Sequence, residues 1–270
     1  RDASLSALQL GAASELQAMP GQMDKSARLA RLGEAGAITE LEQIRARFDG
    51  LLQTLGQGGS YAGATLLPAP ASMQTLLQEL DLQWKKSSAL ATRLGAQGTA
   101  LAGASGAVQA INAASGAFAD AADQFGRRVI AMNADGSALR AVHGLLLHAQ
   151  RATLLANALF AAGTEPSATA ATLAGEAEQL RQRLGELERL TSGSALDDSL
   201  RALGSAAAPI LEAIERITAD AGAVQQVSEA SAGIAANTPA LLAASSALGT
   251  ELAERTGGFG PLHAGAALAA

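Results

Sequence analysis

Apolar residues recur at alternating steps of three and four along much of the chain, as in amphipathic helices that pack in bundles. The clearest series occupies these positions near the C-terminal end: Val224, Val227, Ser231, Ile234, Thr238, Leu241, Ser245, Leu248 and Leu252. The spacing predicts the seam of a coiled coil or an antiparallel bundle. Small polar residues in this seam would let helix backbones approach closely. Pro239 predicts a kink or a break near Asn237.

Segments rich in Gly, Pro, Asn, Asp and Ser separate the periodic stretches and predict turns or loops. They cover residues 32–37, 56–72, 133–137, 162–168 and 191–199. Either Thr164 or Ser167 is expected to cap the helix that follows. Asp197 and Asp198 are expected at a helix start, where carboxylates favour the positive end of the helix dipole. The intervals between these breaks predict about eight helices.

An internal repeat divides the chain into two similar helical modules. The segment ELEQIRARF (40–48) recurs as EAEQLRQRL (176–184), and a weaker match follows between 80–94 and 203–217. Further along the same alignment, Ile111 and Phe118 correspond to Ile234 and Leu241. Three matches in the same order favour duplication over chance. We therefore expect modules at 1–135 and 136–255, followed by a tail at 256–270.

Composition agrees with helices rather than strands. The 270 residues are 49% hydrophobic but only 3% aromatic. The apolar side chains are mainly Ala and Leu, which favour closely packed helices. The formal net charge of −6 gives no basic field for nucleic acid. The predicted fold is all-α, with two tandem antiparallel helical-bundle modules in an elongated arrangement.

Catalytic and metal-binding chemistry has little material in this chain. There are no cysteines, and the three histidines are His143, His148 and His263. His143 and His148 are five residues apart, which does not place them on one helix face as a zinc helix requires. We predict no enzyme, no metal and no cofactor. Trp84 is expected to be a packing anchor.

Arg151 is the one charged residue that needs explanation, because its segment HAQRATLLANALF (148–160) is otherwise largely apolar. On a helix its neighbours are Leu147, His148, Leu154 and Leu155. A second apolar stripe lies opposite: Val142, Leu145, Ala149, Ala152, Ala156 and Leu159. Two apolar faces predict two packing partners, one of them a second copy of the chain. Arg151 then lies at a subunit seam, or it simply pairs with Glu176 or Glu178.

Several motifs resemble those of the PilJ family, the chemoreceptor-like transducers of type IV pili, whose helical module is similar to the sensor domain of nitrate-responsive histidine kinases. They are AQRATLLANAL (149–159) with its degraded counterpart GQMDKSARLA (21–30), IRARFDGLLQTLGQGG (44–59), LLPAPASMQTLLQELDLQW (66–84) and FGRRVIAM (125–132). In the degraded counterpart, Met23 stands against Arg151. The resemblance covers about residues 10–255.

The resemblance implies a periplasmic sensory region between two membrane helices of a bacterial inner-membrane receptor. It implies a homodimer, type IV pilin as a periplasmic partner, and a cytoplasmic chemotaxis kinase that controls twitching motility. The chain lacks an initiator Met and its tail GPLHAGAALAA (260–270) is almost wholly apolar. By itself this tail fits either a mobile end or the first turns of a spanning helix. The resemblance implies the latter, with 256–270 as a juxtamembrane tail.

The resemblance also supplies an alternative function. In the nitrate sensors each module opens on a helix with a Gln-Arg-centred motif, the nitrate box, whose arginine binds an anion across the dimer seam. This implies Gln150 and Arg151 as ligands here. The first module has no matching arginine, and Ala152 and Thr153 depart from the nitrate box. The three hypotheses are therefore a pilus-linked sensory domain, a small-anion sensor, and a helical protein with a structural role alone.

Overall fold

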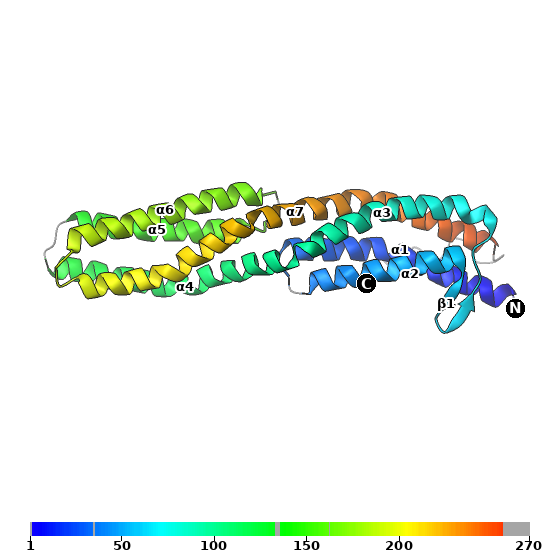
Figure 1. Cartoon of the computed structure of the whole chain (residues 1–270), viewed down its shortest axis with the longest axis horizontal. Helices are drawn as coiled ribbons and strands as arrows, with labels where there is room; N and C mark the ends of the chain where they lie inside the picture. The colour runs from blue at the N-terminus through cyan, green and yellow to red at the C-terminus, as the bar shows by residue number, and fades with distance from the viewer. Residues whose placement is uncertain (1, 35, 133–135, 162, 256–270) are drawn as a thin grey trace. The chain divides into compact units, whose positions relative to one another are not determined.

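The computed structural model describes residues 2–34, 36–132, 136–161 and 163–255, and within them the chain is almost entirely helical (Figure 1). The all-α prediction is confirmed. The helices are α1 (Asp2–Arg31), α2 (Ala37–Gln57), α3 (Gln74–Ala96), α4 (Gly98–Ala131), α5 (Gly136–Ala158), α6 (Pro166–Thr191) and α7 (Asp197–Arg255).

The described residues form seven α-helices, where about eight are expected, and α7 is unbroken over 59 residues. Of the kink or break predicted near Asn237, the break does not occur, although Pro239 cannot donate a backbone hydrogen bond there. Asn237 lies inside the helix and donates to the carbonyl of Gln83 at 2.9 Å and to Ser87 Oγ at 2.8 Å. These contacts tie α7 to α3 beside the proline.

The segment predicted as a loop at 56–72 contains regular structure. An antiparallel hairpin pairs β1 (Gly59–Tyr61) with β2 (Ala64–Leu66), and a 3₁₀ turn covers Ala71–Met73. Gly63, with a φ of 77°, follows Ala62, with a φ of 50°, in the turn between the strands. Strands this short lack the alternation of apolar and polar residues that would predict them from sequence.

Two expectations about helix starts have different outcomes. Asp197 and Asp198 lie in the first turn of α7, as predicted. The predicted side-chain cap of α6 is wrong, because Glu165 occupies the capping position without a side-chain hydrogen bond and Pro166 follows it. Thr164 donates instead to the carbonyl of Ala161. Proline at the first helical position needs no backbone donor, so this start is stable without a cap.

The helices belong to two compact units. Unit 1 comprises residues 1–96 and 229–270, and its described part holds α1, α2, the hairpin, α3 and the C-terminal part of α7. Trp84 is 2% exposed and stacks on Phe48 with ring centroids 3.9 Å apart, while its indole N–H donates to Asp49 at 2.5 Å. The predicted packing role of Trp84 is confirmed.

Unit 2 comprises residues 97–228 and is a four-helix bundle of α4, α5, α6 and the first part of α7. Phe118 and Phe125 of α4 are fully buried in it. Arg128 of α4 donates to Ser199 of α7 at 2.6 Å. Neither unit coincides with the modules expected at 1–135 and 136–255, because the boundary of unit 2 falls at the start of α4.

Burial follows the internal repeat through every helix. Buried positions of α1 recur 129 residues later in α5 and the residue that follows it, as the pairs Ala12/Ala141, Ala13/Val142, Leu16/Leu145, Pro20/Ala149, Met23/Ala152, Ala27/Ala156 and Ala30/Leu159. Those of α2 recur 136 residues later in α6, as Ala37/Leu173, Leu41/Ala177, Ile44/Leu180, Leu51/Leu187 and Leu55/Thr191. The same residues of each copy therefore make the core.

The third and fourth helices repeat at a spacing of 123 residues. α3 matches the start of α7 in Leu80/Leu203, Trp84/Ala207, Ser87/Ile210, Ala91/Ile214 and Leu94/Ile217. α4 matches the rest of α7 in Leu101/Val224, Ala104/Val227, Ile111/Ile234, Phe118/Leu241, Ala122/Ser245, Phe125/Leu248 and Val129/Leu252. A polar contact recurs as well, since Arg45 contacts Thr92 and the matching Arg181 contacts Glu215.

Each unit takes its fourth helix from the other copy of the repeat. α4 belongs to the first copy by sequence but packs in unit 2, whereas the end of α7 belongs to the second copy but packs in unit 1. The two copies are therefore exchanged through their last helices, which explains why the sequence modules and the packed units have different boundaries.

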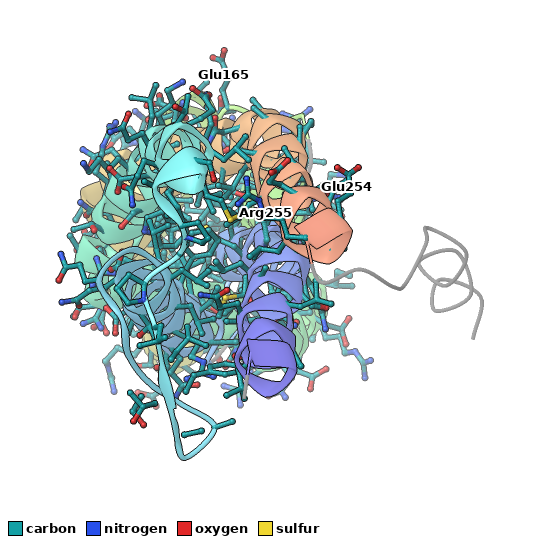
Figure 2. The ribbon with its side chains drawn as sticks, turned by 90° about the vertical axis from the view of Figure 1, so that its right-hand side faces the viewer. Glu165, Glu254 and Arg255 are labelled. Atoms are coloured by element: carbon teal, nitrogen blue, oxygen red, sulfur yellow. The ribbon has the colours of Figure 1, made fainter. Side chains whose placement is uncertain are left out.

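Within the described ranges, no helix has the length and apolarity needed to cross a bilayer. The tail at 256–270, which the resemblance assigns to a juxtamembrane segment, lies outside the described residues together with His263. Figure 2 shows Glu254 and Arg255 at the end of α7. There Arg255 donates to Glu251 at 2.8 Å.

Candidate functional site

The middle of α5 carries the residues that the sequence singled out. Nδ1 of His148 lies 2.6 Å from Oε2 of Glu176 on α6, and both side chains are 14% exposed. Nη1 of Arg151 lies 3.9 Å from Oε1 of the same glutamate, and its side chain is 56% exposed. Glu176 is therefore held mainly by His148, and Arg151 contributes a loose, solvent-screened contact.

This arrangement contains the ion pair expected between Arg151 and Glu176. The other candidate partner, Glu178, instead accepts a hydrogen bond from Gln182 at 3.1 Å. Gln150 is exposed beside Arg151. Neighbouring residues of a helix point about 100° apart, so Gln150 and Arg151 do not converge on one point within this chain. Their predicted role as joint ligands needs a second surface that contacts both.

Arg151 and Met23 do not occupy equivalent places. Met23 is 1% exposed in the core of unit 1, and the burial pattern pairs it with the buried Ala152. The residue equivalent to Arg151 is Gln22. The alignment of Met23 with Arg151 is therefore wrong by one position. Two short polar motifs contain too few apolar residues to determine which positions of the two helices face the core.

The two apolar faces predicted for α5 have different environments. The stripe from Val142 to Leu159 packs inside unit 2. On the side of Arg151, Leu147 is 42% exposed and Leu154 is 71% exposed. Leucines exposed to this degree on each side of an arginine are typical of a surface that contacts a partner.

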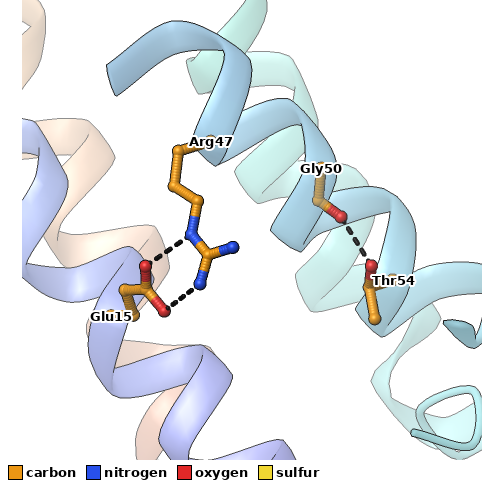
Figure 3. A network of polar contacts seen from close by, with 4 residues as sticks. All are labelled: Glu15, Arg47, Gly50 and Thr54. Carbon is orange, nitrogen blue, oxygen red and sulfur yellow. Dashed lines mark hydrogen bonds and ion pairs between the residues drawn. The ribbon is translucent and has the colours of Figure 1, made fainter. Parts of the chain in front are cut away.

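A second polar cluster lies in unit 1, where α1, α2 and the hairpin meet. Arg47 of α2 donates through Nε and Nη2 to the two carboxylate oxygens of Glu15 on α1, at 2.6 and 2.8 Å (Figure 3). The guanidinium carbon of Arg47 lies 5.9 Å from the centre of the Tyr61 ring. Side-on pairing of both oxygens makes this the strongest type of arginine–carboxylate contact.

The cluster changes the acidity of its members. Hydrogen bonding to Arg47 lowers the pKa of Glu15 below its usual value, despite partial burial, which acts in the opposite direction. The same hydrogen bond raises the pKa of Arg47. Burial and the neighbouring carboxylate raise the pKa of Tyr61, so its hydroxyl stays protonated at neutral pH. Glu15 and Arg47 are both charged there, and the cluster links three elements of unit 1.

No family model matches the chain, and no curated protein matches it. The described residues also contain no group of three or more His, Asp or Glu side chains arranged to hold a metal ion. The exposed side of α5 presents Arg151 together with Leu147 and Leu154, groups that can contact a partner protein or an anion.

Proposed function

We propose that the chain is the periplasmic sensory region of a type IV pilus chemoreceptor. In this role it detects pilin or surface contact and relays the signal across the inner membrane to a chemotaxis-type kinase that controls twitching motility. The proposal rests on the motif resemblance, and one structural observation supports its mechanism. That observation is α7, a single helix that belongs to both units and leads toward the C-terminal end of the chain.

The C-terminal part of α7 has the side chains expected of a helix that moves against its neighbours. Ser231 and Ser245 are buried in its seam, at 3% and 0% exposure. A Cβ atom at Gly233 would lie 2.8 Å from Leu90 of α3, and one at Gly249 would lie 2.8 Å from Gln17 of α1. Small residues interlock less deeply than Leu or Ile, so a small axial shift breaks few contacts.

The exposed side of α5 supplies the surface through which two copies would pair. Leu147 and Leu154 are exposed on this face, and Arg151 lies between them along the helix. Pairing two copies through this face buries apolar area that is otherwise in water. In the proposed receptor, the membrane helices raise the local concentration of the two copies and favour this contact.

The first test is a pull-down of the purified chain with the major pilin lacking its N-terminal helix. It is run beside the same chain with Arg151→Ala. Binding by both proteins is expected, because the pilin surface is proposed to be separate from the Arg151 surface. An unrelated helical protein of similar charge serves as the control bait. Failure of both chains to bind would contradict pilin sensing and would redirect the search to soluble ligands.

A small-anion sensor is the second candidate, and the weak 3.9 Å contact of Arg151 with Glu176 favours it. A guanidinium that is 56% exposed and loosely paired can accept an oxyanion, which Gln150 of the second copy could complete at a two-fold seam. Calorimetric titration with nitrate, nitrite, sulfate and phosphate tests this function. Saturable heat that disappears with Arg151→Ala is the expected result, and no heat for any of the four anions would reject it.

A further inference from the structure

The Glu15–Arg47 pair of unit 1 has an incomplete counterpart in unit 2. The repeat places Arg183 of α6 at the position of Arg47, 136 residues later, and Gly144 of α5 at the position of Glu15, 129 residues later. A Cβ atom at Gly144 would lie 3.3 Å from Nε of Arg183, so the guanidinium packs directly against α5 at the position where unit 1 has Glu15. The arginine is therefore retained where its carboxylate is absent.

The guanidinium of Arg183 has not been satisfied in another way. Its Nε is buried and has no hydrogen-bond partner within the described part of the chain. Its Nη1 donates to Glu186 at 2.8 Å on the same helix. In Arg47 the carboxylate binds along the Nε–Nη2 edge. The edge that binds Glu15 in unit 1 is thus the edge whose Nε is unpaired in unit 2.

The surroundings of Arg183 are open and favour an anion. Arg183, Glu186 and Arg189 line a hollow of about 460 Å³ on α6, together with Gln179, Gln182 and Gly185. Arg140 stands where unit 1 has Gly11, one helical turn before Gly144 on the same face of α5. The hairpin whose Tyr61 lies against Arg47 has no equivalent between α6 and α7. The hollow itself holds two arginines and one carboxylate, that of Glu186.

We propose that Arg183, which lies beside Gly144 and lines the hollow together with Arg189, forms a binding site for a small carboxylate ligand in unit 2. The ligand carboxylate takes the place that Glu15 fills in unit 1 and accepts hydrogen bonds from Nε and Nη2. The side chain of Arg183 is 41% exposed, so it can turn outward to meet the ligand. The site lies between α5 and α6, as the Arg151–Glu176 contact does, but about two helical turns away from Arg151 along α5. It does not depend on the pilus-linked function.

The test is calorimetric titration of the whole chain with acetate and succinate at low ionic strength, beside sulfate and nitrate at the same ionic strength. Saturable binding of at least one carboxylate is expected, with an affinity at least tenfold above that of either inorganic anion. Side-on pairing matches the two oxygens of a carboxylate. Equal binding of the inorganic anions would overturn the assignment to carboxylates, and no binding of either carboxylate would reject the site.

Two variants locate the binding. Arg183→Gln removes the charged edge, and Gly144→Glu fills the site with a tethered carboxylate, so each is expected to weaken binding at least tenfold. Arg127→Gln is the matched control, because it removes an exposed arginine of the same unit that pairs only at the surface with Asp123. Circular dichroism confirms that each variant is folded. Binding that survives both Arg183→Gln and Gly144→Glu, or that is lost with Arg151→Ala alone, would overturn the proposal.

Discussion

At the scale of single residues, the bidentate pair of Glu15 and Arg47 makes stability depend on pH. The pKa of Glu15 is lowered in the folded chain. A lowered carboxyl pKa stabilises the fold fully above the unfolded value of about 4.3, and this stabilisation is lost as the pH falls through the folded pKa. The pair therefore contributes at neutral pH and not in strong acid.

Glu15→Gln tests this contribution. We expect the free energy of unfolding to fall by about 0.5–1 kcal/mol at pH 7, since the pair is partly exposed to solvent. At pH 3 the difference from the parent chain should largely disappear. Urea denaturation at both pH values measures it, with Glu254→Gln at the exposed end of α7 as the control. An equal loss at both pH values would show that the charge of Glu15 is not the cause.

Gly144→Glu restores in unit 2 the carboxylate that unit 1 has at Glu15. Replacing a helical glycine favours α5 by up to about 1 kcal/mol, once Arg183 shifts by a few tenths of an ångström to clear the new Cβ atom. Gly144→Gln shares this gain, so it is the matched control. We expect the glutamate variant to exceed the glutamine variant by about 0.5–1 kcal/mol in thermal unfolding, through an ion pair with Arg183. High salt should reduce the difference, and a salt-independent difference would contradict the ion pair.

The sequence reveals these residues only in part. Arg47 and Arg183 lie inside the matched segments 40–48 and 176–184, so their equivalence is visible without a structure. Glu15 and Gly144 lie in α1 and α5, whose sequences barely match. Their equivalence depends on the register in which the two helices are aligned, and only the pattern of buried residues determines that register. Shifting the match by one residue pairs Met23 with Arg151 and conceals the unpaired arginine in unit 2.

At the scale of elements, the seam of α7 is the best test of helix packing. Ser245 is fully buried, and its counterpart in α4 is Ala122, so neither copy has room for a large side chain there. Ser245→Leu should lower the free energy of unfolding by about 1–3 kcal/mol through overpacking. Ser246→Leu, on the exposed side of the same turn, is the control. Chemical denaturation measures both, and equal effects would contradict a closely packed seam.

The same seam separates a packing effect from a signalling effect. Ser231 has Val108 as its counterpart in α4, so Ser231→Val introduces a residue that the repeat already accommodates. Ser231→Leu and Ser245→Leu are both expected to lock or splay the bundle in an intact receptor. Kinase output measured in the receptor should change with the leucine variants and less with Ser231→Val. Unchanged output in folded leucine variants would contradict sliding of α7.

Helix type and most helix limits could be predicted from the sequence, because apolar spacing repeats over many turns. The continuity of α7 could not be predicted, because a proline usually ends a helix unless contacts with neighbouring helices stabilise it. Asn237 provides such a hold through α3. The break at Gln97 between α3 and α4 could not be predicted either, because no proline marks it. It involves a single residue with a φ of −96° and a ψ of 5°.

At the scale of the whole molecule, the exchange of fourth helices separates evolutionary modules from folding units. A duplicated segment corresponds to α1 through α4, yet α4 packs with the helices of the second copy. Local sequence patterns specify which helix faces are apolar, and both copies present equivalent faces. The choice of partner for the fourth helix therefore depends on the connection at Gln97 and on the continuity of α7, not on the apolar pattern alone.

This exchange predicts how fragments fold. Residues 97–228 contain all four helices of unit 2 in one continuous segment, so this fragment should unfold cooperatively as a monomer. Residues 1–135 contain one complete copy of the repeat but lack the part of α7 that completes unit 1. This fragment should expose the apolar face that α7 covers, and should unfold without cooperativity or associate through that face. Thermal unfolding followed by circular dichroism, with light scattering for mass, compares the two. The prediction would be contradicted if the 1–135 fragment were a cooperatively folded monomer and the 97–228 fragment were unfolded. Each copy of the repeat would then fold as a sequence module, with α4 packed against α1, α2 and α3.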